Sequence, residues 1–357
     1  MENTEPMPHV ARLKPYYHEL EAGRVYLWCA CGQSANQPFC DGSHRGTSFR
    51  PVRYVAASAG EEVLFCGCKA TCSAPFCDGH HNNLPGAYHE DDPASADNRR
   101  VSWVEPDAQG LARLDGRCYV LSLARVPKAA LGSTRTCVPI STTLGAEHQS
   151  QVYYEVGVEP TPVLAFGESH VILFVAAGRG TVNIGGRSFD VDEKSGVYVR
   201  PGEAFQIRAR GEAAPVRVYV SAGPAMSTPT VHQAMPDVFD ASCPARVVSL
   251  DPAQRHRMAV RYFQMLVDKS VGSTLITQFI GSIPESKAEP HRHLYEEALI
   301  ILSGRGVMWT ETRKAEVEPG DVIFFPRKQL HSLQCTVPEG MEVVGVIYPG
   351  DNPSVNY

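Results

Sequence analysis

Long apolar runs and any excess of positive charge are missing from this sequence. No segment approaches the roughly 18 consecutive apolar residues that a transmembrane helix needs, so we expect no membrane span. Residues 1–20 contain no apolar core, which argues against a secretory signal peptide. The formal net charge of −6 argues against general nucleic-acid binding, because phosphate recognition requires basic side chains. We therefore expect a cytoplasmic protein that binds neither membranes nor nucleic acids.

Helical periodicity is also scarce, whereas residues that break helices are common. The 357 residues include 30 Gly and 27 Pro, which favours a mainly β fold, and the length allows two or three domains. Seven of the 11 Cys fall between Cys29 and Cys77. Without a secretory route, a disulfide framework is not expected, and metal-bound thiolates in a reducing compartment fit better.

A ligand-rich motif occurs twice near the N-terminus. In each copy, Cys-x-Cys follows a short apolar strand, at residues 26–28 and 63–65, and Pro-Phe-Cys-Asp-Gly-x-His comes next. The Cys and His that end the motif are four residues apart and fit one turn of a starting helix. Three thiolates and one imidazole could hold a structural zinc ion. The copies are offset by 37 residues, and their ligand-type residues are Cys29, Cys31, Cys40 and His44, and Cys66, Cys68, Cys77 and His81.

Both copies resemble the CDGSH iron–sulfur motif of the mitoNEET family, over about residues 22 to 86. Two motifs in one chain resemble the single-chain tandem type of that family, and the departure is His80, where Ser, Thr or Ala is usual. The resemblance implies two [2Fe–2S] clusters, each held by the three Cys and one His of a copy. An imidazole in place of a thiolate removes one negative charge and raises the reduction potential. Cys72 occupies no ligand position.

A second group of ligand-type residues lies between residues 281 and 331, in β-type surroundings. On an extended strand, side chains two residues apart leave from one face, as His291 and His293 would. Apolar strands are expected at 298–302 and 322–325. Three imidazoles and one carboxylate suit iron, manganese, nickel, copper or zinc. The candidate ligands are His291, His293, Glu297 and His331.

This second group resembles the two motifs of the cupin family. The gaps among its four ligands, Gly304 and Gly320 match the family, and the resemblance implies one metal ion inside a small β-barrel. The departures are Lys328, where the family has a glycine, and Cys335, where it often has Asn. Nine residues separate Gly281 from His291, whereas the family pattern has five. A barrel that kept its histidines without binding a metal is the alternative.

The residues before this barrel repeat its pattern without its ligands. Gly178-Arg179-Gly180 parallels residues 304–306 at an offset of 126, and Gln206 lies where a ligand histidine would project. His170 is then a packed histidine, and we expect a bicupin, a double β-barrel with one metal site. The expected organisation is an N-terminal tail at 1–21, a tandem CDGSH domain at 22–86, a linker with short strands at 87–125, a degenerate barrel at 126–225 and a metal-binding barrel at 226–357. Residues 349–357 form a polar stretch that we expect at the surface.

Together these features favour a non-haem Fe(II)-dependent oxygenase or oxidase. Iron held by the cupin ligands would leave positions open for O₂ and a small organic substrate. Two [2Fe–2S] clusters would supply electrons that come from an external reductase or ferredoxin. Tyr295, Trp309 and Cys335 are candidate catalytic residues of the pocket, although ordinary barrel packing is the more common role for such residues.

Two other classes of function remain open. A metal-dependent isomerase, epimerase or lyase would use the clusters for regulation or structure. A non-enzymatic redox or iron sensor would hold or transfer its clusters while the barrel binds a small ligand. Exposed barrel edges are consistent with a homodimer in each case.

Overall fold

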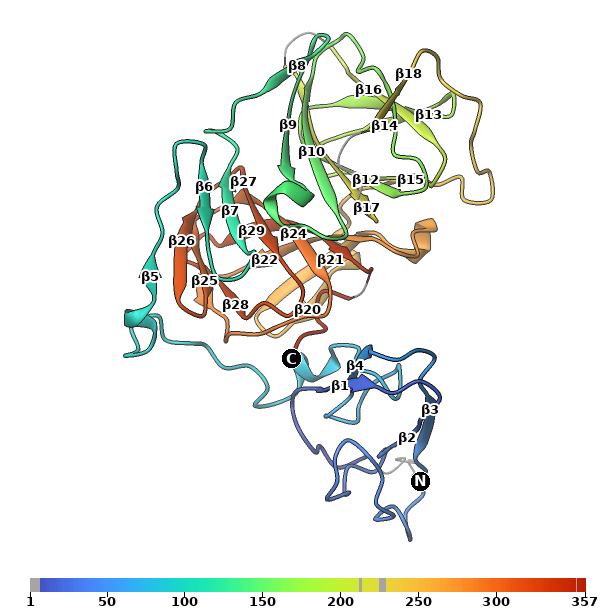
Figure 1. Ribbon diagram of the computed structural model, residues 1–357, viewed down its shortest axis with the longest axis vertical. Coiled ribbons are helices and arrows are strands. Elements are labelled where there is room, and N and C mark those ends of the chain that lie inside the picture. The colour runs from blue at the N-terminus through green and yellow to red at the C-terminus, as the bar shows by residue number, and fades with distance from the viewer. Residues whose placement is uncertain (1–6, 212–213, 225–228, 351) are drawn as a thin grey trace. The chain divides into compact units, whose positions relative to one another are not determined.

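The computed structural model describes residues 7–211, 214–224, 229–350 and 352–357 (Figure 1). These residues form strands and short 3-10 helices and contain no α-helix, which confirms the mainly β fold class. Correspondingly, this part of the chain has no helix that is long and apolar enough to cross a membrane. The 3-10 helices are η1 (His80–Asn83), η2 (Asn98–Arg100), η3 (Thr142–Leu144), η4 (Pro252–Gln254) and η5 (Lys269–Val271).

The chain divides into two compact units. The first, which we call the cysteine unit, comprises Met1–Glu90, His291–Leu294 and Asn352–Tyr357. The second, which we call the barrel unit, comprises Asp91–Pro290 and Tyr295–Asp351.

Two small antiparallel sheets support the cysteine unit. On one of their strands burial alternates, with Tyr26 and Trp28 buried and Val25 and Leu27 exposed, as expected of a half-buried strand. Two of the strands end directly before Cys29 and Cys66, where the sequence predicted strands. The pairs are β1 (Tyr16–Leu20) with β4 (Glu61–Phe65), and β2 (Val25–Trp28) with β3 (Val52–Val55).

One aromatic core serves both copies of the cysteine motif. Phe39 and Phe76 are the aromatic residues of the repeated Pro-Phe-Cys sequence, and both pack on Phe65, with ring centroids 5.4 Å and 5.7 Å away. Phe65 itself is fully buried. Trp28 donates a hydrogen bond from Nε1 to the carbonyl of Cys66 at 3.0 Å, which links copy one to copy two. The duplication therefore forms a single domain and not two separate ones.

The barrel unit contains two barrels, each made of a larger and a smaller sheet. We call the barrel that comes first in the sequence the front barrel and the other the rear barrel. In the front barrel the inward side chains are almost all Val, Leu, Ile and Phe, and they form a continuous apolar core. Its larger sheet has the order β19 (Val247–Val248), β15 (Gly196–Val199), β12 (His170–Ala177), β17 (Val216–Gly223), β10 (Ser150–Val156), β9 (Thr134–Ile140), β8 (Ala129–Leu131). Its smaller sheet has the order β14 (Arg187–Val191), β13 (Gly180–Ile184), β16 (Ala204–Ala209), β11 (Val163–Ala165), β18 (Thr230–His232).

The rear barrel takes in short strands that precede the front barrel in sequence. β7 pairs with β27, and β5 runs parallel to β26, so part of the segment expected as a linker completes the rear barrel. The larger sheet has the order β20 (His256–Met258), β21 (Arg261–Val267), β22 (Thr277–Ile283), β29 (Met341–Tyr348), β24 (Glu296–Ser303), β27 (Asp321–Phe325), β7 (Tyr119–Ser122), β6 (Leu111–Arg113). The smaller sheet has the order β23 (Ser286–Lys287), β28 (His331–Cys335), β25 (Gly306–Thr310), β26 (Arg313–Val317), β5 (Ser102–Trp103).

A buried carboxylate joins the two barrels. Glu296 is fully buried and accepts hydrogen bonds from the backbone N–H groups of Glu147, His148 and Gln149 at 2.8 to 3.2 Å. Three such bonds compensate for the loss of water around a charged group. Because neighbouring residues on a strand point to opposite faces, Glu297 points the other way, into the rear barrel. This bond set fixes the start of β24 and therefore the position of the Glu297 side chain.

Candidate cluster and metal centres

The first copy of the cysteine motif arranges its ligands as two pairs. Cys29 Sγ and Cys31 Sγ lie 3.6 Å apart, directly after β2. Cys40 Sγ lies 3.1 Å from Nδ1 of His44. Burial raises the pKa of the Cys31 thiol, and the backbone N–H of Gln33, which donates to Cys31 Sγ at 3.5 Å, acts against that effect. The His44 segment is a turn and not the helical turn that the spacing predicted.

The second copy repeats this pairing with closely similar distances. Cys66 Sγ and Cys68 Sγ lie 3.5 Å apart after β4, and Cys77 Sγ lies 3.4 Å from Nδ1 of His81. A hydrogen bond from Cys66 lowers the pKa of Cys68 to about 6, so this thiol can ionise and act as a ligand at neutral pH. Here a helical turn forms as the 3-10 helix η1, but it begins at His80 and therefore includes His81 and not Cys77.

The pairing suits a two-metal cluster better than a single zinc ion. Two ligands on one tetrahedral metal, with metal–sulfur bonds of about 2.3 Å, lie roughly 3.5–3.8 Å apart. The two Cys–Cys pairs, at 3.6 Å and 3.5 Å, fit that separation, and the Cys–His pairs are slightly closer, at 3.1 Å and 3.4 Å. A single zinc ion would require all four ligand atoms of a copy to be equally close. Within the described residues, the cysteine copies contain no three ligand atoms that all lie within 4.8 Å of one another. Such a group occurs in the cupin segment instead. Two pairs on two metals is the arrangement of a [2Fe–2S] cluster.

A buried cation accompanies the cysteines of the second copy. Lys69 is 5% exposed, has a left-handed backbone with φ of 66°, and donates from Nζ to the carbonyl of Cys66 at 2.9 Å. Its Nζ also lies 4.6 Å from the Trp28 ring centroid. Burial lowers the pKa of Lys69, and the neighbouring thiolates act against that effect. The equivalent residue of copy one is Gly32, where a Cβ would lie 1.7 Å from the carbonyl oxygen of His9.

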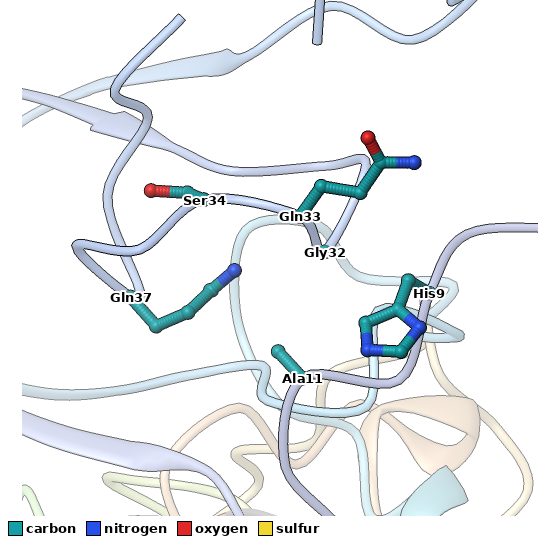
Figure 2. Close-up of a pocket in the computed structure, with 6 residues that line it drawn as sticks. All are labelled: His9, Ala11, Gly32, Gln33, Ser34 and Gln37. Atoms are coloured by element: carbon teal, nitrogen blue, oxygen red, sulfur yellow. The ribbon is translucent and has the colours of Figure 1, made fainter. Parts of the chain in front are cut away.

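The first copy has an open cleft beside its ligands. The cleft has a volume of about 480 Å³, and Figure 2 shows that the segment carrying His9 and Ala11 faces the loop after Cys31 across it. Gln37 of that loop donates from Nε2 to Cys29 Sγ at 3.5 Å. The cleft therefore lies next to the first cluster site but does not expose Cys29 or Cys31, which are both buried. The residues that line the cleft are His9, Ala11, Gly32, Gln33, Ser34 and Gln37.

The cupin segment brings two imidazoles and one carboxylate together. One ligand atom from each of His293, Glu297 and His331 lies within 4.8 Å of the other two, and all three residues are buried. Glu297 is on β24 and His331 begins β28. Gly345, on β29, leaves room for the carboxylate, because a Cβ there would lie 3.0 Å from Glu297 Oε1 and 2.4 Å from the Phe279 ring. These donors are those that a divalent transition metal binds.

Local contacts prepare His331 to bind a metal through Nε2. Its Nδ1 lies 2.8 Å from the carbonyl oxygen of Gln329, an acceptor, so Nδ1 carries the proton. The lone pair is then on Nε2. The Phe325 ring centroid, 4.4 Å from that of the imidazole, restricts rotation of the ring.

Three of the four predicted cupin ligands meet, and His291 is not among them. The segment after Pro290 is not a regular strand, so the rule that residues two apart share a face does not apply to His291 and His293. Among the described residues, the group of three thus consists of His293, Glu297 and His331.

The predicted pocket residues take different positions in the rear barrel. Cys335 lies four residues after His331 on β28, hence on the same face, and is buried in the apolar core together with Tyr295. Trp309 pairs with Ser332, and its neighbour on β25 pairs with His331, so Trp309 points to the other face of the sheet. There its ring contacts two buried cations, Lys287 and Lys314, whose Nζ atoms lie 4.8 Å and 4.1 Å from the ring centroid.

The front barrel uses its polar residues for packing. His170 Nδ1 lies 2.6 Å from the hydroxyl of Tyr198, and the two rings stack. Gln206 donates from Nε2 to the carbonyl of Thr161 at 2.7 Å. Both residues therefore have structural partners, as expected of a barrel without a metal site.

Two features near the cluster sites were missed at the level of sequence. The first is the buried cation Lys69. The equivalent position of copy one is Gly32, and this difference between the copies was the sequence signal that could have pointed to it. The prediction of a surface tail was wrong for its last residues, since Ser354, Val355 and Asn356 are all buried. No local pattern marks them, because their partners are more than 250 residues earlier in the chain.

Comparisons with known proteins agree with both kinds of site. The family model for the iron-binding zinc finger of CDGSH type matches residues 9–45, and that for the cupin domain matches residues 282–347. CDGSH iron-sulfur domain-containing protein 3, mitochondrial, from Mus musculus is 51% identical over 51 residues, 14% of this chain and 37% of the relative. The Homo sapiens protein is 48% identical over 54 residues, 14% of this chain and 42% of the relative. The chain thus spans well under half the length of these curated relatives.

Solved structures resemble the barrels at low sequence identity, which shows the fold alone. Protein Ylba from E. coli has a TM-score of 0.52 at 15% identity, covering 72% of this chain and 99% of that one. A mutant of Bacillus subtilis oxalate decarboxylase has 0.52 at 14%, covering 65% and 77%. Lactobacillus farciminis oxalate decarboxylase in complex with formate has 0.52 at 14%, covering 67% and 87%.

The fold and the sites define a metal-binding β-barrel protein that also carries an iron–sulfur domain. More narrowly, the chain combines a CDGSH domain near its N-terminus with a cupin domain, in a double-barrel arrangement like that of the bicupins.

Proposed function

We propose that this protein is a cupin-type, non-haem Fe(II)-dependent oxygenase or oxidase that acts on a small organic molecule. The observation that carries the proposal is the buried group of two imidazoles and one carboxylate in the rear barrel. Two His and one carboxylate around open positions is the ligand set typical of non-haem Fe(II) oxygenases. Bound iron would supply the site for O₂ activation next to a substrate.

The chain's own residues would hold the metal and shield it. Glu297 supplies the negative charge that favours a divalent cation, and His331 is oriented through its Nδ1 bond to the chain. Ile301, Met308 and Leu333 belong to the apolar core around the ligands and limit access of water. Cys335 has its thiol pKa raised by burial, so it stays protonated beside the site.

Two [2Fe–2S] clusters, held by the two copies of the cysteine motif, would supply the electrons. Their mixed Cys and His ligation favours acceptance of an electron from a low-potential donor. The donor is proposed to be an external reductase or ferredoxin, and the remaining partners are O₂ and the substrate. The open cleft beside the first copy supports access of a donor to that site. Eleven cysteines without a disulfide, six of them proposed as thiolate ligands, suit a reducing, cytoplasmic setting.

The proposal is tested on protein purified without air, with iron and acid-labile sulfide counted per chain. Clusters are reduced chemically, and their reoxidation is followed optically after O₂ and a panel of small organic acids, phenols and thiols are added. We expect His331→Ala to abolish substrate-stimulated reoxidation. The matched control is His170→Ala, which removes a buried imidazole of the front barrel.

Two results would contradict the proposal. Turnover with zinc or manganese in the cupin site and oxidised clusters would identify an isomerase or lyase. A cupin site that binds no metal in solution, together with cluster transfer to an apo-ferredoxin, would identify a carrier or sensor.

A further inference from the structure

The second CDGSH motif is covered by Asn352–Tyr357, which we call the 352–357 segment. Asn82, in the 3-10 helix after the motif, donates from Nδ2 to the carbonyl of Ser354 at 2.8 Å. Asn352 donates from Nδ2 to the carbonyl of Asp78 at 3.3 Å. Ser354 lies directly on Gly79, since a Cβ on that glycine would be 1.9 Å from Ser354 Oγ. The Asp-Gly step of the motif is therefore held from outside by the 352–357 segment.

The same segment reaches the imidazole of His81. This ring is 3% exposed, and its Nδ1 faces Cys77 Sγ, which leaves Nε2 on the other side. Nε2 is buried and has no partner at hydrogen-bond geometry. The side-chain amide of Asn356 is close enough to interact with the ring, and Asn356 is itself 8% exposed. A small adjustment of this amide would give the outer nitrogen of a cluster ligand the hydrogen bond that such ligands usually have.

The other end of the 352–357 segment is bound to the residue before a cupin ligand. Tyr357 and Arg292 exchange two backbone hydrogen bonds, each 2.9 Å long, as residues do in an antiparallel pair. His293 follows Arg292 in the chain. The Tyr357 ring also stacks on Tyr17, with centroids 5.6 Å apart and planes 11° from parallel. One short segment thus contacts a cluster ligand and the backbone that carries a metal ligand.

The first CDGSH motif has no equivalent cover in the described chain. A Cβ on Gly42, the counterpart of Gly79, would meet only the end of the Arg45 side chain, at 3.9 Å. His44 is half-buried, whereas His81 is buried. The two motifs are alike in sequence and in ligand pairing, so their surroundings distinguish them.

From this difference we propose that the 352–357 segment is a positioning element that couples the second cluster site to the cupin site, with Asn356 as its positioning residue at His81. The coupling rests on the proposed function, because it makes the second cluster the one that passes electrons to the cupin metal. The positioning of His81 by Asn356 does not depend on that function and is measured separately.

Asn356→Leu in the full chain tests the positioning. Leucine keeps the branched shape of asparagine but lacks the amide, so the hydrogen bond to His81 Nε2 cannot form. We expect the EPR signal and midpoint potential of one cluster to change while those of the other stay the same. His44→Cys and His81→Cys, which each change one cluster, identify which signal belongs to which site.

A matched pair of glycine variants tests the contact itself. Gly79→Ala and Gly42→Ala introduce the same methyl group at equivalent positions with φ of 83° and 97°, so the backbone strain is comparable. Only the first displaces Ser354. We expect Gly79→Ala to reproduce the change seen in Asn356→Leu and Gly42→Ala to leave the second cluster unaltered.

The coupling is measured by flash photoreduction of protein with oxidised clusters and ferric cupin iron. The photoreductant supplies one electron per chain, which passes through a cluster and reduces the cupin iron, as followed by freeze-quench EPR. We expect Asn356→Leu and Gly79→Ala to slow reduction of the cupin iron at least tenfold and Gly42→Ala to slow it less than twofold.

The results separate the positioning role of Asn356 from the proposed electron transfer to the cupin iron. An unchanged second-cluster signal in both Asn356→Leu and Gly79→Ala would overturn the positioning role. Loss of the second cluster alone would support it, and equal loss of both clusters would contradict it. If the unaltered chain never reduces its cupin iron, the proposed function fails, while the cluster signals still decide the role of Asn356.

Discussion

The two copies of the cysteine motif differ in their surroundings more than in themselves. Their ligand distances differ by at most 0.3 Å, and both follow a short strand that packs on one aromatic core. Copy one has an open cleft and a half-buried histidine. Copy two has a buried cation, a buried histidine and the 352–357 segment above it. Ligand geometry is thus local, whereas the electrostatics of each site come from distant parts of the chain.

The largest effect on cluster binding is expected from a change in the aromatic core that the two copies share. Phe65→Ala removes the ring on which both Phe39 and Phe76 pack, and a fully buried Phe lost in this way costs about 3–5 kcal/mol. We expect both clusters to be lost together, measured as iron and sulfide per chain and by thermal unfolding. Phe49→Ala, at a half-buried position, is the control. Retention of one cluster in Phe65→Ala would show that the copies do not share a core.

Exchanging each histidine for cysteine would sharpen the comparison. A thiolate adds one negative charge to the cluster surroundings, so we expect both His44→Cys and His81→Cys to lower a potential, by on the order of 100 mV. The shift should be larger for His81→Cys, because a charge acts more strongly where water is excluded. Spectroelectrochemical titration measures both shifts, and equal shifts would mean that burial at His81 does not matter.

A pH effect in the rear barrel must be separated from any at the clusters. Burial raises the pKa of Asp321 to about 6, although the backbone N–H of Glu318 acts against it. Since the folded state then holds its proton more tightly than the unfolded state, stability falls as pH rises from about 4 to 6. The loss amounts to about 3 kcal/mol at neutral pH. We expect Asp321→Asn to stabilise the barrel at pH 7 and to have little effect at pH 4, as followed by denaturant unfolding. A stabilisation that does not change with pH would refute this assignment.

The smallest expected effect belongs to the buried cation of copy two. Lys69→Met should lower the potentials of both clusters, by on the order of 50 mV, because a nearby positive charge favours the reduced state. Both are expected to respond, since the cysteines of both copies act on Lys69. Arg45→Met removes a cation that is exposed and screened by solvent, so it should change neither potential. A shift confined to one cluster would place Lys69 within a single site.

Much of the metal chemistry could be predicted from sequence because it depends on residue type and short spacing. The apolar runs at 298–302 and 322–325 lie within β24 and β27, Glu297 directly precedes the first run, and His331 begins the strand after the second. His291 illustrates the limit, since the face rule requires an extended strand and the segment after Pro290 is irregular. The position of Trp309 illustrates a second limit of prediction from sequence. The register of β25 against β28 decides which face of the sheet Trp309 occupies.

The sequence by itself determined the mainly β class, the duplication, the residues proposed as ligands in each cysteine copy and the approximate place of the candidate cupin ligands. The tertiary structure alone decided that strands near residues 102–122 complete the rear barrel and that the 352–357 segment covers one cysteine copy and not the other. Periodicity and spacing act over a few residues, whereas burial depends on contacts such as that between Asn82 and Ser354, 272 residues apart. Two nearly identical motifs can therefore occupy unlike environments within one chain.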